Sequence, residues 1–159
     1  MAAQYRNHHD RQRPPEKTLQ ELWPSYLQDG YFDVERNLKP EYVSREKVQP
    51  LVKAMNDAKP KLTNGQLRRF FQHCRAIEAK LKANTSTWNA QIASVKKLDI
   101  AAADAYGKSK KKIPTLFHDF IKSNVTTIKT EDDFLKGFLP HFEALVGFGS
   151  QHLHDHERN

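Results

Sequence analysis

The stretch that decides the fold is LTNGQLRRFFQHCRAIEAKL, residues 62–81. Thr63, followed three residues later by Gln66, has the pattern of a capping box, which marks the first turn of a helix. The apolar side chains after it recur at spacings of three and four, so they form one continuous stripe. They are Leu67, Phe70, Phe71, Cys74, Ile77 and Leu81. The stretch therefore predicts a long amphipathic helix with its stripe in a core.

The segments on either side of this helix carry the same helical period. Ser44 can cap a helix that runs to about residue 58, and Pro50 within it predicts either a later start or a tolerated kink. Three further helices are predicted to begin at Trp88, Pro114 and Thr130.

The last predicted helix carries residues that interrupt or end helices. Pro140 predicts a kink near Leu139, because proline removes a backbone donor and restricts the residue before it. Gly147 and Gly149 are predicted to end the helix.

No segment shows the alternation of a convincing strand, so the predicted fold class is all-α. We expect a compact bundle of about five helices with an irregular, aromatic-rich N-terminal strap. The strap, residues 22–43, is predicted either to pack across the core or to dock on a neighbouring subunit. The predicted organisation is a disordered or partner-bound arm over 1–20, a helical bundle domain over 21–149 and a flexible tail over 150–159.

Charge is distributed unevenly along the 159 residues. The chain has 26 basic and 19 acidic residues, and residues 61–112 alone carry 12 basic and 3 acidic ones. This asymmetry favours a polyanionic partner, because a basic face attracts phosphates and gains affinity when their counterions are released. The single cysteine excludes an internal disulfide, and the short apolar runs exclude a membrane helix. A cytoplasmic protein is expected.

Basic residues lie on both borders of the apolar stripe and continue into the next helix and the loop after it. The expected RNA-binding residues are Arg68, Arg69, Arg75, Lys80, Lys82, Lys96, Lys97 and Lys108. A structural role for Arg68, in hydrogen bonds that pin the bundle, is an equal alternative. Cys74 lies on the apolar stripe and is expected to fill the core.

The motifs of common enzymes are missing: there is no glycine-rich phosphate loop, no CxxC and no HExxH. We therefore expect no catalytic residue, no metal and no cofactor. Two alternatives stay open, a small metal-independent ribonuclease that uses His73 and a helical DNA-binding protein.

Three separated segments resemble the small subunit of type III-A (Csm) CRISPR effector complexes. Residues 62–71 resemble its Leu-Thr-x-x-Gln-Leu-Arg-x-Phe signature. Residues 31–41 are similar to the strap that precedes the signature, and residues 138–148, with Glu-Ala-Leu-Val at 143–146, are similar to the closing helix. The three follow one another in the order of the family.

The resemblance implies a helical bundle present in several copies, which stack along the guide–target RNA duplex. It implies a subunit that is not the nuclease and that holds the duplex through its phosphate and sugar backbone. The implied partners are the guide RNA, the target RNA, the large cyclase-type subunit, the backbone subunits and further copies of itself.

Overall fold

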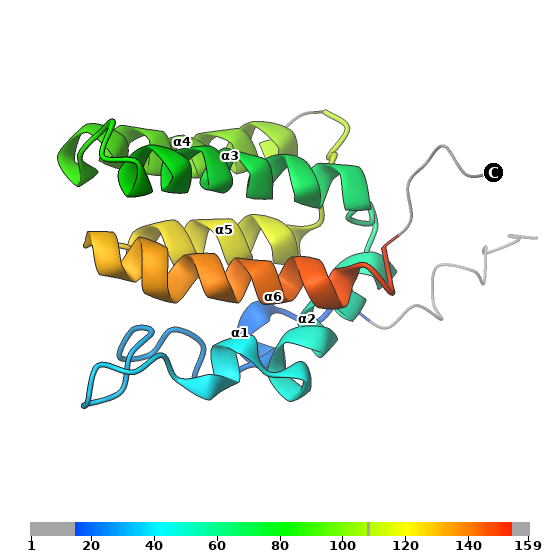
Figure 1. The fold of residues 1–159 in the computed structure, drawn as a ribbon. Helices are drawn as coiled ribbons and strands as arrows, with labels where there is room; N and C mark the ends of the chain where they lie inside the picture. Colours follow the sequence, from blue (N-terminus) through cyan, green and yellow to red (C-terminus); the bar gives the residue numbers. More distant parts are fainter. Residues whose placement is uncertain (1–14, 108, 154–159) are drawn as a thin grey trace, which may run out of the picture.

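A computed structural model describes residues 15–107 and 109–153, and its helices confirm an all-α fold (Figure 1). The described part of the chain has five long helices and three short helical segments, two of which precede the first long helix and one of which precedes the last. The elements are α1 (Leu19–Leu22), η2 (Pro40–Val43), α2 (Arg45–Asp57), α3 (Asn64–Lys82), α4 (Trp88–Gly107), α5 (Thr115–Thr127), η3 (Asp133–Phe138) and α6 (Leu139–Gly149). Within the described ranges, extended pairing is limited to one isolated bridge between Phe32 and Leu38.

The predicted caps form. At the start of α3, the Thr63 hydroxyl accepts a hydrogen bond from the Gln66 amide at 3.2 Å, and the Gln66 side chain accepts one from the Thr63 amide at 3.0 Å. At the start of α2, the Ser44 hydroxyl accepts from the Lys47 amide at 3.3 Å. The helix α2 then runs through Pro50 without a later start. Pro50 is the sixth of its thirteen residues, inside the helix, where its exposed ring lies on the solvent side and its missing N–H removes one backbone hydrogen bond.

Pro140 disturbs the last helix in a different way from the predicted kink. The six residues before the final α-helix, Asp133–Phe138, form a π-helical segment. A proline ring crowds the carbonyl four residues earlier, and the wider π turn relieves that crowding without a break in the helix. Of the two glycines predicted to end the helix, Gly149 is confirmed as its last residue, and the prediction for Gly147 is wrong because α6 continues through it.

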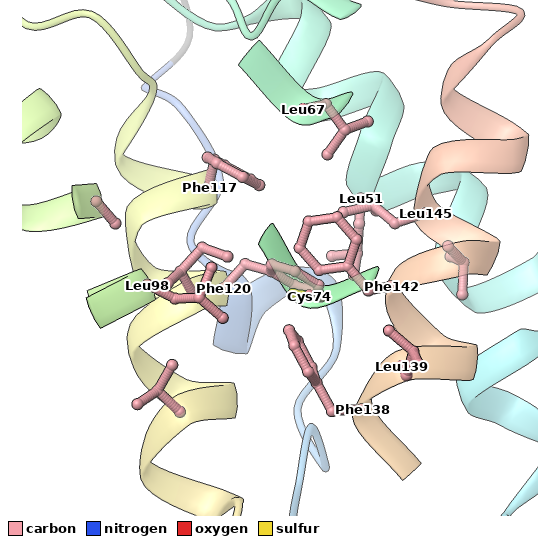
Figure 2. Close-up of a cluster of buried hydrophobic side chains, with 14 of the residues drawn as sticks. Leu51, Leu67, Cys74, Leu98, Phe117, Phe120, Phe138, Leu139, Phe142 and Leu145 are labelled. Atoms are coloured by element: carbon pink, nitrogen blue, oxygen red, sulfur yellow. The ribbon is translucent and has the colours of Figure 1, made fainter. Parts of the chain in front are cut away.

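The helices form three layers, which Figure 1 shows from the side. α3 and α4 make one outer layer, α5 and α6 make the middle layer, and α2 makes the other outer layer together with the strap. The core fills the spaces between the layers (Figure 2). Cys74 lies in it, fully buried, as predicted. The fully buried aromatic side chains are Trp23, Tyr31, Tyr42, Phe117, Phe120, Phe134, Phe138 and Phe142.

A chain of hydrogen bonds ties the strap to the middle layer. The Tyr31 hydroxyl donates to the Asn124 side chain at 2.8 Å, and Asn124 donates to the Tyr26 hydroxyl at 2.7 Å. Tyr26 lies 2.8 Å from Nε2 of His141, and Nδ1 of His141 donates to the Tyr42 carbonyl at 2.6 Å. The strap is therefore part of the folded core, in agreement with the packing alternative.

Burial and bonding keep His141 neutral. Its side chain is fully buried, and desolvation lowers its pKa from 6.5 to about 4, against the opposing effect of the Tyr42 carbonyl. Nε2 then accepts the bond from the Tyr26 hydroxyl. A protonated ring could not accept it.

The packed region extends beyond the predicted domain boundaries at both ends. Leu19 is fully buried, and the Glu16 carboxylate accepts a hydrogen bond from the Lys59 amide at 2.8 Å. At the other end, Leu153 is 4% exposed. The remaining parts of the predicted arm and tail, 1–14 and 154–159, lie outside the described residues. No helix of the described part is both long and apolar enough to span a membrane.

Candidate nucleic-acid interface

The outer layer of α3 and α4 carries the predicted RNA-binding residues that the structure describes, which are all of them except Lys108. The two helices pack side by side, and His73 links them, because its Nε2 lies 2.8 Å from the Ser94 carbonyl. A carbonyl only accepts, so Nε2 carries the proton and donates. This bond fixes the register of the two helices near the basic residues.

A hollow of 280 Å³ lies at the seam between α3 and α4. Its lining is mostly apolar, and Arg69 of α3 and Lys97 of α4 bring two exposed cations to it. The full set of lining residues is Arg69, Phe70, His73, Lys97, Leu98 and Ala101. The hollow thus combines an apolar surface with cations from two helices.

Two other predicted residues are engaged in ion pairs. Arg75 lies 2.8 Å from Glu78, and Lys82 lies 3.1 Å from the same carboxylate. Partial burial raises the pKa of Glu78, but the bonds from Arg75 and Lys82 outweigh it and leave the pKa below its ordinary value. Arg75 also lies over the Phe71 ring, at 4.9 Å from its centroid, and 3.8 Å from Glu143 of α6.

The remaining predicted residues that the structure describes, Arg68, Lys80 and Lys96, are exposed. Arg68 is exposed and bonds to Asn64 one turn earlier, at 3.3 Å. Lys80 and Lys96 are exposed, and they make no ion pair within residues 15–107 and 109–153. The predicted residue Lys108 lies outside the described residues. The structure therefore unites Arg69 and Lys97 at one hollow, and it places Arg75 and Lys82 in a separate ion-paired row.

The structure also shows the surroundings of the residues that the two alternative functions, a ribonuclease and a DNA-binding protein, would use. One nitrogen of His73, the proposed ribonuclease residue, is bonded to the Ser94 carbonyl. Phe70 and Phe71 of α3 pack on rings of the middle layer, at 5.1 Å from Phe117 and 5.4 Å from Phe142. In the described part of the chain, no group of three or more metal-ligating side chains converges.

Sequence reasoning did not find the hollow or the exposed isoleucine of α4 that lies next to one of its lining residues. Ile100 is 66% exposed, and Ala101 beside it lines the hollow. The exposed alanines at 90, 93, 101 and 103 alternate on α4 with the exposed polar residues Asn89, Lys96, Lys97 and Asp104, so the sequence pattern alone did not single out this site.

Comparison with known proteins gives one match. The family model described as Csm2 Type III-A matches residues 42–154, more than two thirds of the chain. The matched segment contains α2 to α6 and every predicted RNA-binding residue. No curated protein and no solved structure matches the chain.

Proposed function

The chain belongs to the Csm2 family, the small subunits of type III-A CRISPR effector complexes, and on this premise we propose that it holds RNA within such a complex. Several copies stack along the guide–target duplex, and their basic side chains contact its phosphate backbone. The protein contributes no catalytic group. Its partners are the guide RNA, the target RNA, the large cyclase-type subunit and the backbone subunits.

The observation that carries the proposal is the set of exposed cations on one outer layer. Arg69, Lys80, Lys96 and Lys97 make no ion pair with any described acidic side chain. Cations without an acidic partner are free to neutralise phosphates and release counterions. Lysine and arginine contacts of this kind position nucleic acid without reading its sequence.

The layered fold supports the assignment of this face. The α3–α4 layer lies on the opposite side of α5 and α6 from α2 and the strap (Figure 1). An RNA duplex on the outer layer therefore leaves the other side of the molecule open for protein partners.

The experiment compares charge reversals on the two sides of the molecule. Lys80→Glu and Lys96→Glu are introduced into the assembled complex, with Lys53→Glu on α2 as the matched control. All three residues are exposed lysines, so each substitution makes the same change in net charge at a position in contact with solvent. We expect the two outer-layer variants to weaken target-RNA retention and to reduce the salt slope by about one for each phosphate that is no longer neutralised.

The result should be the same for two guides of unrelated sequence, because phosphate contacts carry no sequence information. Retention that is unchanged for Lys80→Glu, for Lys96→Glu and for the two combined would contradict the proposed RNA face. A loss that depends on the guide sequence would contradict backbone recognition.

A further inference from the structure

The loop between Phe32 and Leu38 is ordered by its own hydrogen bonds and exposes one apolar side chain to solvent. Val34 is fully exposed, at 101%. Beside it, the Asp33 carboxylate accepts hydrogen bonds from the amides of Glu35 and Asn37, each at 2.9 Å. The Asp33 amide also donates to the Asn37 carbonyl at 2.8 Å. Because the loop is already ordered, little conformational entropy is lost when it binds.

The charges around Val34 are acidic on both sides. Asp33 precedes it and Glu35 follows it, and both are exposed. The basic residue that comes next, Arg36, lies over the Phe32 ring at 5.4 Å from its centroid. The tip therefore offers one apolar side chain between two carboxylates.

The hollow between α3 and α4 has the complementary composition. Its lining is mostly apolar, and its two cations are Arg69 and Lys97. Next to it, Ile100 and Ala101 are exposed on α4 among the charged residues Lys96, Lys97 and Asp104. A mostly apolar hollow with an exposed isoleucine nearby fits an occupant with an apolar tip.

The loop cannot fill the hollow of its own chain. It belongs to the strap layer, and the hollow belongs to the α3–α4 layer on the opposite side of the middle layer (Figure 1). A contact between these two different surfaces joins one copy head to tail with the next, and such contacts continue in a row.

We propose that the loop Asp33–Arg36 of one copy docks into the α3–α4 hollow of the next copy, with Val34 in the hollow and Glu35 and Asp33 facing Lys97 and Arg69. This inference rests on the proposed stacking of copies and names the surfaces that make the contact. In a docked copy, the carboxylates of the neighbouring loop take up Arg69 and Lys97, whereas the outer-layer cations Lys80 and Lys96 lie outside the hollow and remain for RNA.

Cross-linking tests the contact directly. A chain carrying Val34→Cys is mixed with a chain carrying Ala101→Cys, and a short thiol-specific cross-linker is added to the free proteins and to complexes assembled from both. The native Cys74 adds little background, because it is buried and its burial raises its pKa to about 12. Ala79→Cys, exposed on α3 outside the hollow, replaces Ala101→Cys in the control.

We expect cross-linked dimers from the Val34 and Ala101 pair and none above background from the Val34 and Ala79 pair. One chain with both Val34→Cys and Ala101→Cys should give a ladder of higher oligomers, because each copy then carries both surfaces. Equal yields for the two pairs in the assembled complex would overturn the proposal.

A charge exchange tests its chemistry. Glu35→Lys and Lys97→Glu should each weaken self-association by about tenfold, since each places like charges opposite one another. The two changes in one chain should restore it, because they exchange the positions of opposite charges. Double-variant association as weak as that of the single variants would show that these residues do not meet.

The two proposals fail in different ways. Lys80→Glu and Lys96→Glu should reduce RNA retention and leave the cross-link yield unchanged. Weaker retention in these variants with no Val34–Ala101 cross-link would leave the RNA face standing and refute the docking contact. A strong cross-link with unchanged retention would refute the RNA face alone.

Discussion

Gly137 has no side chain, and the ring of Tyr31 fills the space beside its Cα. A Cβ at this position would lie 2.6 Å from Cγ of Tyr31, closer than such atoms approach. Tyr31 is fully buried in the strap and cannot move aside without breaking its bond to Asn124. Because Gly137 lacks a side chain, the strap can pack directly against η3.

Gly137→Ala should accordingly lower the free energy of unfolding by about 1–3 kcal/mol, the usual cost of overpacking a core. Urea unfolding of the purified chain measures it. The control is Gly147→Ala in α6, where a Cβ meets no atom within 4 Å. There the change should stabilise by up to about 1 kcal/mol, because alanine loses less backbone entropy than glycine in a helix. Equal effects of the two changes would refute this account of Gly137.

His141 makes stability depend on pH. Its pKa is about 4 in the folded chain and 6.5 as the ordinary value, so between these values the unfolded chain binds a proton that the folded chain does not. The contribution of the neutral ring is complete above pH 6.5 and is lost as the pH falls towards 4. The loss amounts to about 3 kcal/mol.

The measurement is urea unfolding from pH 7.5 to pH 4, for the wild type and for His141→Gln. Glutamine keeps hydrogen-bonding groups but does not titrate. The difference in unfolding free energy between the two chains should shrink steadily below pH 6.5. A difference that is constant with pH would show that His141 is not buried in the neutral form.

At the scale of the element, α3 carries a cation row whose charge is partly neutralised by its own carboxylate. Glu78 binds Arg75 and Lys82, which lie three residues before it and four residues after it. The Glu78 side chain is 13% exposed, but both cations reach solvent, so screening keeps the contribution of the pairs to stability small. Their larger effect is electrostatic, because the Glu78 carboxylate lowers the positive potential that the outer layer offers to a phosphate backbone.

Glu78→Gln should therefore change the free energy of unfolding by less than about 1 kcal/mol. It should also tighten target-RNA retention and steepen its salt dependence, because Lys82 loses its acidic partner and Arg75 keeps only the more distant Glu143. Filter binding of the assembled complex across a salt series measures this. Glu46→Gln, an exposed acidic residue on α2, makes the same charge change on the other side of the molecule and should leave retention unchanged.

The helices were predictable because their signals are local. Thr63 and Gln66 lie within one turn, and the apolar stripe of α3 repeats every three or four residues, so short-range periodicity suffices. The burial of His141 and Asn124 depends on tyrosines that lie about a hundred residues away in the strap, and no local pattern reports such partners. The presence of Arg69 and Lys97 at one hollow likewise depends on how α3 and α4 pack against each other. The ion pairs of Arg75 and Lys82 with Glu78, in contrast, join residues three and four positions apart on one helix, a spacing that the sequence shows.

At the scale of the whole molecule, the chain of hydrogen bonds through the strap couples the strap to both helices of the middle layer. Asn124 of α5 bonds to Tyr31 and Tyr26 of the strap, and Tyr26 bonds to His141 of α6. A segment with little regular secondary structure is usually the first to open locally. Here we expect the strap to open together with α5 and α6.

Asn124→Ala tests this coupling, since it takes away the acceptor of the buried Tyr31 hydroxyl and the bond to Tyr26. The change should cost about 1–3 kcal/mol. Hydrogen exchange should show the loss both in the strap, at the Lys39 amide bonded to the Tyr31 carbonyl at 2.9 Å, and in α5. Loss of protection in the strap alone would mean that it opens independently.

The loop and the hollow lie on opposite sides of the molecule, so a row of docked copies always has two unlike ends. One end presents a vacant hollow and the other a vacant loop, whatever the length of the row. Such a contact sets no limit on the number of copies, because each added copy again leaves one vacant hollow and one vacant loop. The number of copies in a row must then be limited by another component. This component is either the length of the bound RNA or a pair of different subunits, one of which covers the vacant hollow and the other the vacant loop.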